Sequence, residues 1–355
     1  MKKTLCALAV GATLISPAIA MAADVKIYGR AHVSLDYLDD GKNYNEVGLS
    51  SNASRLGFKA EQKLENGMTV FGQIEQQINF TSGNTDGGAD FATRDTFVGL
   101  KGDFGQVKVG RFDTPFKAAR NAVNYFGDQV GDLRNVTRVS DQRFDERNEN
   151  TIEYKSPKFG NGFNVAAALS LHSGTGIDKD QTTGDAEKDN KAYDIALTYK
   201  EGPIDFAIAY AMYEENATNA RADSDRDAFR IVGAYKLTDS LNLGAFYQLA
   251  KVDGQDNRDS DVYGIAADYK LAPKTTLRGQ VFQRSVDADE RDSTLLAIGV
   301  EHRLDKAVRV YANLATVLND ENVNLNPWSQ ARTNNVSGSL GENSTGLSLG
   351  FRYDF

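Results

Sequence analysis

The sequence predicts an all-β chain, folded as a transmembrane antiparallel β-barrel of about sixteen strands. Three observations support this fold class. Apolar and polar residues alternate with a period of two along most of the chain, as in strands whose two faces meet different surroundings. Short turns and long polar loops follow one another in alternation, which is typical of barrels that cross a membrane. The polar face carries too much charge for a dry protein core, so we expect it to line water.

The N-terminal 22 residues are expected to be a secretory signal peptide rather than part of the barrel. Two lysines follow the initiator methionine, residues 5–15 are mostly apolar, and small residues precede a cut after Ala22 or Ala23. Residues 23–355 would then form a single barrel domain. The only cysteine lies inside the removed segment, so the mature chain would contain no disulfide.

Sixteen segments have the alternation of membrane-crossing strands, and many have the length of about ten residues that a tilted crossing needs. The first, residues 24–37, places Ile27, Val33 and Leu35 on one face and Arg30 on the other. In chain order the segments are 24–37, 54–64, 68–78, 96–101, 106–111, 150–155, 163–172, 192–200, 204–213, 228–236, 241–250, 262–270, 276–284, 294–303, 308–317 and 344–355.

The connections separate the two ends of the predicted barrel. Those after even-numbered segments are short and contain Gly, Pro, Asn or Asp, as in the Asn66-Gly67 hairpin turn, whereas those after odd-numbered segments are long and polar. An outer-membrane barrel has short periplasmic turns and long extracellular loops. We therefore expect the chain to lie in a bacterial outer membrane.

The polar face of the strands supports a water-filled lumen. Hydrocarbon packing cannot accommodate so many unpaired charges. The charged residues of this face are Lys26, Arg30, Arg55, Lys59, Glu61, Glu75, Arg230, Arg278, Arg309 and Arg352.

The sequence argues against an enzyme and against a nucleic-acid partner. The three histidines stand alone, and the chain has no paired-cysteine site or nucleophile elbow. We expect no catalytic residues, no cofactor and no bound metal. With 40 Lys and Arg against 49 Asp and Glu, the net charge of −9 also disfavours a surface that binds nucleic acid.

Several stretches resemble the general porins of Gram-negative outer membranes. They are "KIYGRAHVSL", "SRLGFKAEQKLENG", "RDTFVGLKGDFGQVKVGR", "NTIEYKSPKFGNGF" and the terminal "SLGFRYDF". Their combination in this order covers the whole mature chain. The resemblance implies a homotrimer and passive diffusion of ions and small hydrophilic solutes. The alternative is a channel specific for a sugar, phosphate or an organic acid, which would show a file of aromatic side chains or a clustered basic trap.

The segment 112–146 is unusually long for a connection without regular structure, and such loops are commonly functional. The resemblance implies that this third loop folds into the lumen and narrows it. The "NYFGDQVGD" stretch is expected at the loop tip, so that Asp128 and Asp132 would supply its acidic side chains.

The resemblance also implies a basic wall opposite the loop, formed by four arginines. Side-chain alternation places Arg30, Arg55 and Arg147 on the inward face. It does not place Arg94 there, so that assignment depends on the resemblance alone. Opposed acidic and basic walls would orient polar solutes in a transverse field.

The chain ends on an apolar strand, which is unusual for a frayed, solvated terminus. Phe351, Tyr353 and Phe355 share one face. They resemble the signal that the outer-membrane assembly machinery reads. The last strand must also pair with the first, because an open edge cannot persist in lipid.

The seven other long loops together hold 26 Asp and Glu residues against 10 Lys and Arg. Acidic loops could bind divalent cations that bridge lipopolysaccharide phosphates. An acidic mouth concentrates cations, whereas a basic constriction favours anions. Since mouth charges are screened within about 8–10 Å at physiological salt, we expect weak selectivity that shifts toward anions as salt rises.

Overall fold

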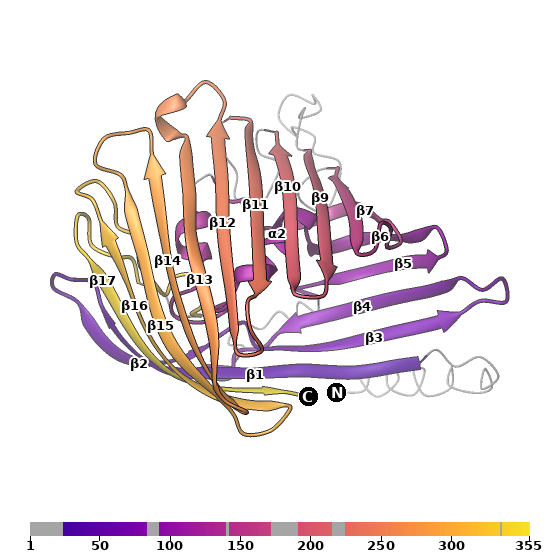
Figure 1. Ribbon diagram of the computed structural model, residues 1–355, viewed down its shortest axis with the longest axis horizontal. Coiled ribbons are helices and arrows are strands. Elements are labelled where there is room, and N and C mark those ends of the chain that lie inside the picture. Colours follow the sequence, from indigo (N-terminus) through magenta and orange to yellow (C-terminus); the bar gives the residue numbers. More distant parts are fainter. Residues whose placement is uncertain (1–23, 84–91, 140–141, 172–190, 215–223, 334–335) are drawn as a thin grey trace, which may run out of the picture.

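The computed structural model describes residues 24–83, 92–139, 142–171, 191–214, 224–333 and 336–355. The expected signal peptide, residues 1–22, lies outside the described residues. The strands form one closed sheet in which every neighbouring pair is antiparallel (Figure 1). They are β1 (Asp24–Asp39), β2 (Asn45–Ser51), β3 (Arg55–Lys63), β4 (Thr69–Gln77), β5 (Thr96–Gly102), β6 (Gly105–Asp113), β7 (Arg147–Lys155), β8 (Phe163–Ser170), β9 (Ala192–Glu201), β10 (Ile204–Tyr213), β11 (Arg226–Lys236), β12 (Leu241–Val252), β13 (Ser260–Ala272), β14 (Thr275–Val286), β15 (Ser293–Arg303), β16 (Val308–Asn319) and β17 (Ser344–Asp354).

The barrel closes where β17, the last strand, pairs with β1, the first (Figure 1). The register runs from Arg30 opposite Asp354 to Asp39 opposite Thr345. Beyond the strand, the backbones of Gly29 and Phe355 exchange two hydrogen bonds of 2.8 and 3.0 Å. The prediction that the last strand pairs with the first is confirmed.

The structure has one strand segment more than predicted, because the second membrane crossing is divided in two. β2 pairs with residues 33–39 of β1, and β3 pairs with residues 24–30. Between them Ala53 has a φ of 53°, a left-handed conformation that interrupts the strand. The sixteen crossings are as predicted, but the loop expected over residues 38–53 is mostly strand.

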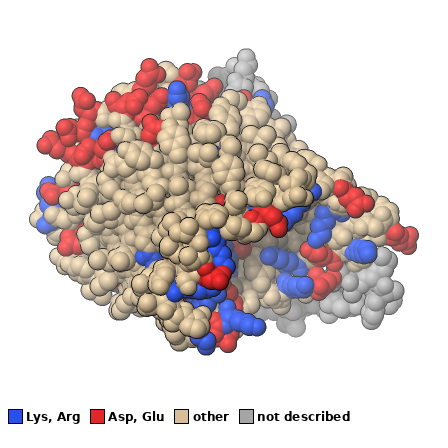
Figure 2. Space-filling view, in the orientation of Figure 1, with Lys and Arg blue, Asp and Glu red and all other residues tan. Residues whose placement is uncertain are grey.

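The two faces of the strands differ as the alternation predicts. In β15, Leu296 and Ile298 point outward and are 36% and 62% exposed, whereas the neighbouring Leu295 and Ala297 are buried. Figure 2 shows a largely uncharged band across the visible face of the barrel, with acidic side chains gathered at the end that carries the long loops. None of the helices in the described ranges is long and apolar enough to span a membrane.

The loop between β6 and β7, residues 114–146 and called L3 below, lies inside the barrel (Figure 1). It contains α2 (Pro115–Ala119), the 3-10 helix η2 (Arg120–Val123) and α3 (Arg134–Thr137). The expectation that this loop has no regular structure is therefore wrong. A further 3-10 helix, η3 (Asp256–Arg258), lies between β12 and β13. Thr114 caps α2, since its hydroxyl accepts a hydrogen bond from the Lys117 amide.

L3 adheres to one side of the barrel through a hydrophobic cluster. Phe116, Leu133 and Phe144 of L3 are at most 1% exposed and pack against inward residues of β9–β16 such as Phe246 and Phe282. The loop therefore fills the β9–β16 side. The remaining passage lies along the wall formed by β1–β7.

A buried arginine of β11 holds both ends of L3. Arg230 Nη1 donates to the Phe116 carbonyl at 2.8 Å and to Asp145 Oδ1 at 2.7 Å, and its guanidinium lies 4.0 Å from the centre of the Phe116 ring. Its side chain is fully buried. The expectation that Arg230 lines water is therefore wrong, because L3 covers it.

Candidate constriction of the channel

A cavity of about 1020 Å³ lies between L3 and the wall of β1–β7. Its lining includes eleven Lys and Arg residues and four Asp and Glu residues. The wall supplies Arg30, Arg55, Arg94, Arg111 and Arg147; L3 supplies Lys117, Arg120, Arg134, Arg138 and Arg143; and the loop after β16 supplies Arg332. The acidic residues are Asp113, Asp128, Asp145 and Glu146.

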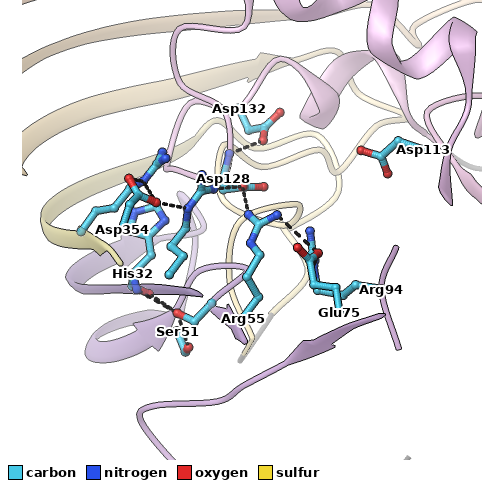
Figure 3. A network of polar contacts seen from close by, with 12 residues as sticks. His32, Ser51, Arg55, Glu75, Arg94, Asp113, Asp128, Asp132 and Asp354 are labelled. Carbon is cyan, nitrogen blue, oxygen red and sulfur yellow. Dashed lines mark hydrogen bonds and ion pairs between the residues drawn. The ribbon is translucent and has the colours of Figure 1, made fainter. Parts of the chain in front are cut away.

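At the L3 tip, Asp128 faces the wall (Figure 3). Its Oδ2 lies 3.4 Å from Arg30 Nη1 and 3.5 Å from Arg55 Nη2, while its Oδ1 accepts a hydrogen bond of 2.9 Å from Arg134 of L3. The backbone of Asp128 has a φ of 60°. This conformation is uncommon outside glycine, although Asp tolerates it better than most residues.

Asp128 is an ionised acid surrounded by arginines. Burial alone would raise the pKa of Asp128, but the charges of Arg134, Arg55 and Arg30 outweigh burial and hold the pKa well below its ordinary range. Asp128 therefore stays charged throughout the physiological pH range, and its charge is offset locally.

Asp132 lies behind Asp128 and is not exposed to the cavity. Its side chain is fully buried; Oδ2 accepts hydrogen bonds from the Asp128 amide at 2.8 Å and from Arg134 Nη2 at 2.6 Å. The structure thus brings Asp128 to the wall and uses Asp132 to hold the turn.

Arg94 is linked to Arg55 of the wall through Glu75. The sequence did not indicate this role for Glu75. Arg94 Nε lies 2.6 Å from Glu75 Oε1, and Arg55 Nη1 lies 3.7 Å from the same oxygen. The hydroxyl of Tyr28 donates to Glu75 Oε2 at 2.9 Å. Glu75 is only 4% exposed, so it acts mainly as a spacer that holds two arginines side by side (Figure 3).

Arg147 lies in the same cavity but away from Asp128. Its Nη2 is 2.7 Å from Asp113 Oδ1, and its Nε pairs with Asp95. Arg30, Arg55 and Arg94 therefore form one cluster with Asp128 and Glu75, while Arg147 forms a second with Asp95 and Asp113.

The five basic residues of L3 were not identified from the sequence. The expectation of an acidic loop opposite a basic wall drew attention only to the carboxylates of this loop. All five Lys and Arg residues of residues 114–146 line the cavity. Their number could have indicated them, since L3 carries five basic and five acidic residues.

A second loop also folds inward. The loop between β16 and β17, residues 320–343 and called L8 below, was expected to lie outside the barrel. Its Trp328, the only tryptophan of the chain, is fully buried against Leu38 of β1 and against Phe126 and Val130 of L3. The indole Nε1 donates to the Val336 carbonyl at 3.0 Å.

Polar contacts join L8 to L3 and to the wall. The Gly131 amide donates to the Pro327 carbonyl at 2.8 Å, and Ser329 Oγ donates to Asn135 Oδ1 at 2.9 Å. Arg332, with 1% of its side chain exposed, lies 3.3 Å from Glu46 of β2. L8 therefore supports L3 through a second hydrophobic cluster, which also includes Ala297 of β15 and Ala315 of β16.

The described residues hold no group of three or more His, Cys, Asp and Glu side chains that could bind a metal ion. The cavity is lined by charged side chains, and the ion pairs between them restrict their motion.

Comparisons with known proteins agree with this geometry. A family model described as Gram-negative porin matches residues 5–322. Outer membrane porin protein 32 of Delftia acidovorans is 28% identical over 375 residues, with both chains fully covered. Major outer membrane protein P.IB of Neisseria sicca is 26% identical over 289 residues, covering 75% of this chain and 78% of the relative.

Two solved structures show the same fold. The anion-selective porin from Comamonas acidovorans matches with a TM-score of 0.80 at 23% identity, covering 94% of this chain and 100% of that one. The trimer form of OmpT from Vibrio cholerae matches with a TM-score of 0.64 at 19% identity and the same coverage. The likeness extends over almost the whole barrel.

Replacing Trp328 with Ala should loosen the contact between L8 and L3. Loss of a buried aromatic ring costs about 3–5 kcal/mol, and here the loss falls on the loops rather than on the barrel. Single-channel recordings should show a larger mean conductance and more open-channel noise. Trp328→Phe keeps a ring in place and is the matched control. Native conductance and noise in a correctly folded Trp328→Ala barrel would contradict this role of L8.

Proposed function

The chain belongs to the Gram-negative porin family and forms a diffusion channel across the outer membrane, and we propose that this channel prefers anions. The proposal rests on one observation: eleven basic residues but only four acidic residues line the constriction cavity. The anion-selective porin that shares this fold supports it. The chain is a channel protein and not an enzyme.

The physical basis is a fixed positive charge in a narrow passage. We propose Arg30, Arg55, Arg94 and Arg147 as the basic wall and Asp128 as the acidic group of the loop, held in place by Asp132. Because Arg134 lies 2.9 Å from Asp128, the loop tip offsets its own acid. The wall arginines then act on a passing solute with little opposition, and a low-dielectric wall concentrates their field in the passage.

The acidic residues at the long-loop end act in the opposite direction. Figure 2 shows acidic side chains gathered there, where they face bulk water. Their effect falls as salt screens them, whereas charges in the constriction are screened less. The anion preference should therefore grow with ionic strength.

Reversal potentials across planar bilayers test the proposal. Under a salt gradient the native channel should favour chloride over potassium, more strongly at high than at low salt. The double variant Arg55→Gln, Arg94→Gln should lower the anion-to-cation permeability ratio roughly two- to fivefold, since a nearby charge is worth about 1 kcal/mol. Lys26→Gln, whose residue does not line the constriction cavity, is the matched control. Cation preference in the native channel at high salt would refute the proposal.

The pH dependence of selectivity has a specific source in L3. Burial lowers the pKa of Lys117 to about 8, although its ion pair with Asp113 at 2.9 Å opposes the shift. The ammonium is charged below pH 8 and neutral above it. The anion preference should therefore fall between pH 7 and pH 9.5.

Lys117→Arg is the matched control for this effect, because an arginine stays charged over the whole range. The fall should be reduced or absent in this variant when reversal potentials are measured at the same pH values. An equal fall in both proteins would show that another group is responsible.

We propose that the chain assembles as a homotrimer, in contact with outer-membrane lipid and lipopolysaccharide. Solved porins with this fold include the trimer form of OmpT. The outward apolar face that lipid would cover can equally pack against a neighbouring subunit. In the bilayer recordings above, channels that close in three equal steps would support the trimer, and single-step closure would argue against it.

The C-terminal residues Phe351, Tyr353 and Phe355 are proposed as the signal for the outer-membrane assembly machinery. Their side chains are 41%, 41% and 48% exposed on the outer face, so a partner can reach them in the finished strand. The backbone bonds between Phe355 and Gly29 do not involve the ring.

Phe355→Ala should therefore separate assembly from stability. The amount of folded protein in the outer membrane of expressing cells should fall several-fold, while refolding of the purified variant in detergent stays close to native. Tyr353 and Phe351 remain in this variant, so a further fall is expected when they are also replaced. Native amounts of Phe355→Ala in the membrane would contradict the assignment.

A further inference from the structure

A second cavity, of about 370 Å³, lies at the long-loop end of the barrel and shares no lining residue with the constriction. Four separate parts of the chain surround it. They are Val139 and Gln142 of L3, Arg258 of η3, the end of β14 with the turn after it, and residues 322–325 of L8. We call it the Arg284 recess, after the buried side chain that lines it.

Arg284 is a buried cation without an acidic partner among the described residues. It is 7% exposed, and Nη2 donates a hydrogen bond of 3.1 Å to Gln142 Oε1. Its Nε is buried with no hydrogen-bond partner in the part of the chain that the structure describes. A buried guanidinium normally has a carboxylate or another anion beside it, because removing its charge from water is costly.

The rest of the lining is basic or neutral. Arg291 and Arg258 also line the recess, and the described lining includes no Asp or Glu. Asp292, at the end of the turn after β14, already accepts hydrogen bonds from Ser285 Oγ at 2.7 Å and from the Val286 amide at 2.9 Å. Its carboxylate is therefore committed to the turn.

Amide side chains complete the recess. Gln142, Asn322 and Asn324 can each donate or accept hydrogen bonds. Gln142 is itself well fixed, since its Oε1 accepts a hydrogen bond of 2.6 Å from Ser260 Oγ and its Nε2 donates to the Arg258 carbonyl. The walls are thus held in place before any ligand arrives.

We propose that the Arg284 recess binds a small soluble oxyanion, with a phosphate or carboxylate group held by the Arg284 guanidinium. Arginine presents donors in a planar fork that matches both groups. The cavity lies at the lower end of the volumes that small-molecule sites occupy. Because L3 lies inside the barrel and forms one wall, the ligand reaches the recess from the aqueous lumen.

This site is independent of the anion preference proposed for the constriction. Selectivity is set where the passage is narrowest, whereas the recess holds an anion to one side of that passage. The acidic loops near the recess reduce the local anion concentration, but their effect is screened beyond about 8–10 Å at physiological salt. Binding should therefore strengthen when an inert salt is raised from low to physiological concentration.

Equilibrium dialysis of radiolabelled inorganic phosphate against the folded, detergent-purified protein tests the site. Chloride is kept at a fixed concentration so that ionic strength does not vary. The native protein should bind phosphate saturably, and Arg284→Gln should bind it at least tenfold more weakly. The double variant Arg55→Gln, Arg94→Gln removes charge only from the constriction cavity and should bind phosphate as the native protein does.

One further variant and one competition measurement keep the test decisive. Arg291→Gln alters an exposed residue of the turn and should weaken binding about threefold, even if Arg284→Gln fails to fold. Unlabelled succinate should displace phosphate if the recess accepts carboxylates. Equal binding by native protein, Arg284→Gln and Arg291→Gln would overturn the proposal, as would the absence of saturable binding. Loss of binding in the constriction variant alone would place the anion in the main channel and refute the recess.

Discussion

The placement of L3 depends on one buried ion pair. Arg230 holds the carbonyl of Phe116 near the start of the loop and the carboxylate of Asp145 near its end. Arg120 adds a second contact, with its Nε 3.2 Å from the other oxygen of Asp145. Buried ion pairs often add little net stability, but an unpaired partner in such a site is costly. The pair therefore restricts L3 to one path across the lumen.

That path explains why the constriction is basic on both sides. L3 places its apolar residues against β9–β16, so its polar residues face the wall of β1–β7. The wall is already rich in arginine, and Glu75 holds two of these arginines together. Asp128 reaches the wall, but it forms an ion pair with Arg134 of the same loop. The acidic contribution of the loop is thus small at the point where a solute passes.

Most of the barrel could be predicted from the sequence, because lipid on one side and water on the other impose a strict alternation. The division of the second crossing could not, since the left-handed backbone at Ala53 has no glycine to signal it. Asp128 and Asp132 are both aspartates of the same short stretch, so the sequence does not distinguish them. The turn between them decides which carboxylate is buried. The inward path of L8 was missed because its single Trp328 lies among polar residues. Arg230 was assigned to water because alternation cannot reveal that a distant loop covers it.

The burial of Trp328 between the two inward loops has a practical consequence. The chain contains no other tryptophan, and this one lies where L8 meets Phe126 and Val130 of L3. When tryptophan is excited selectively over the 15 tyrosines, the fluorescence emission therefore originates from the junction of the two loops. Its emission maximum and its accessibility to a soluble quencher would follow the opening and closing of that junction in an unlabelled sample. The molecule thus contains its own optical reporter of loop movement.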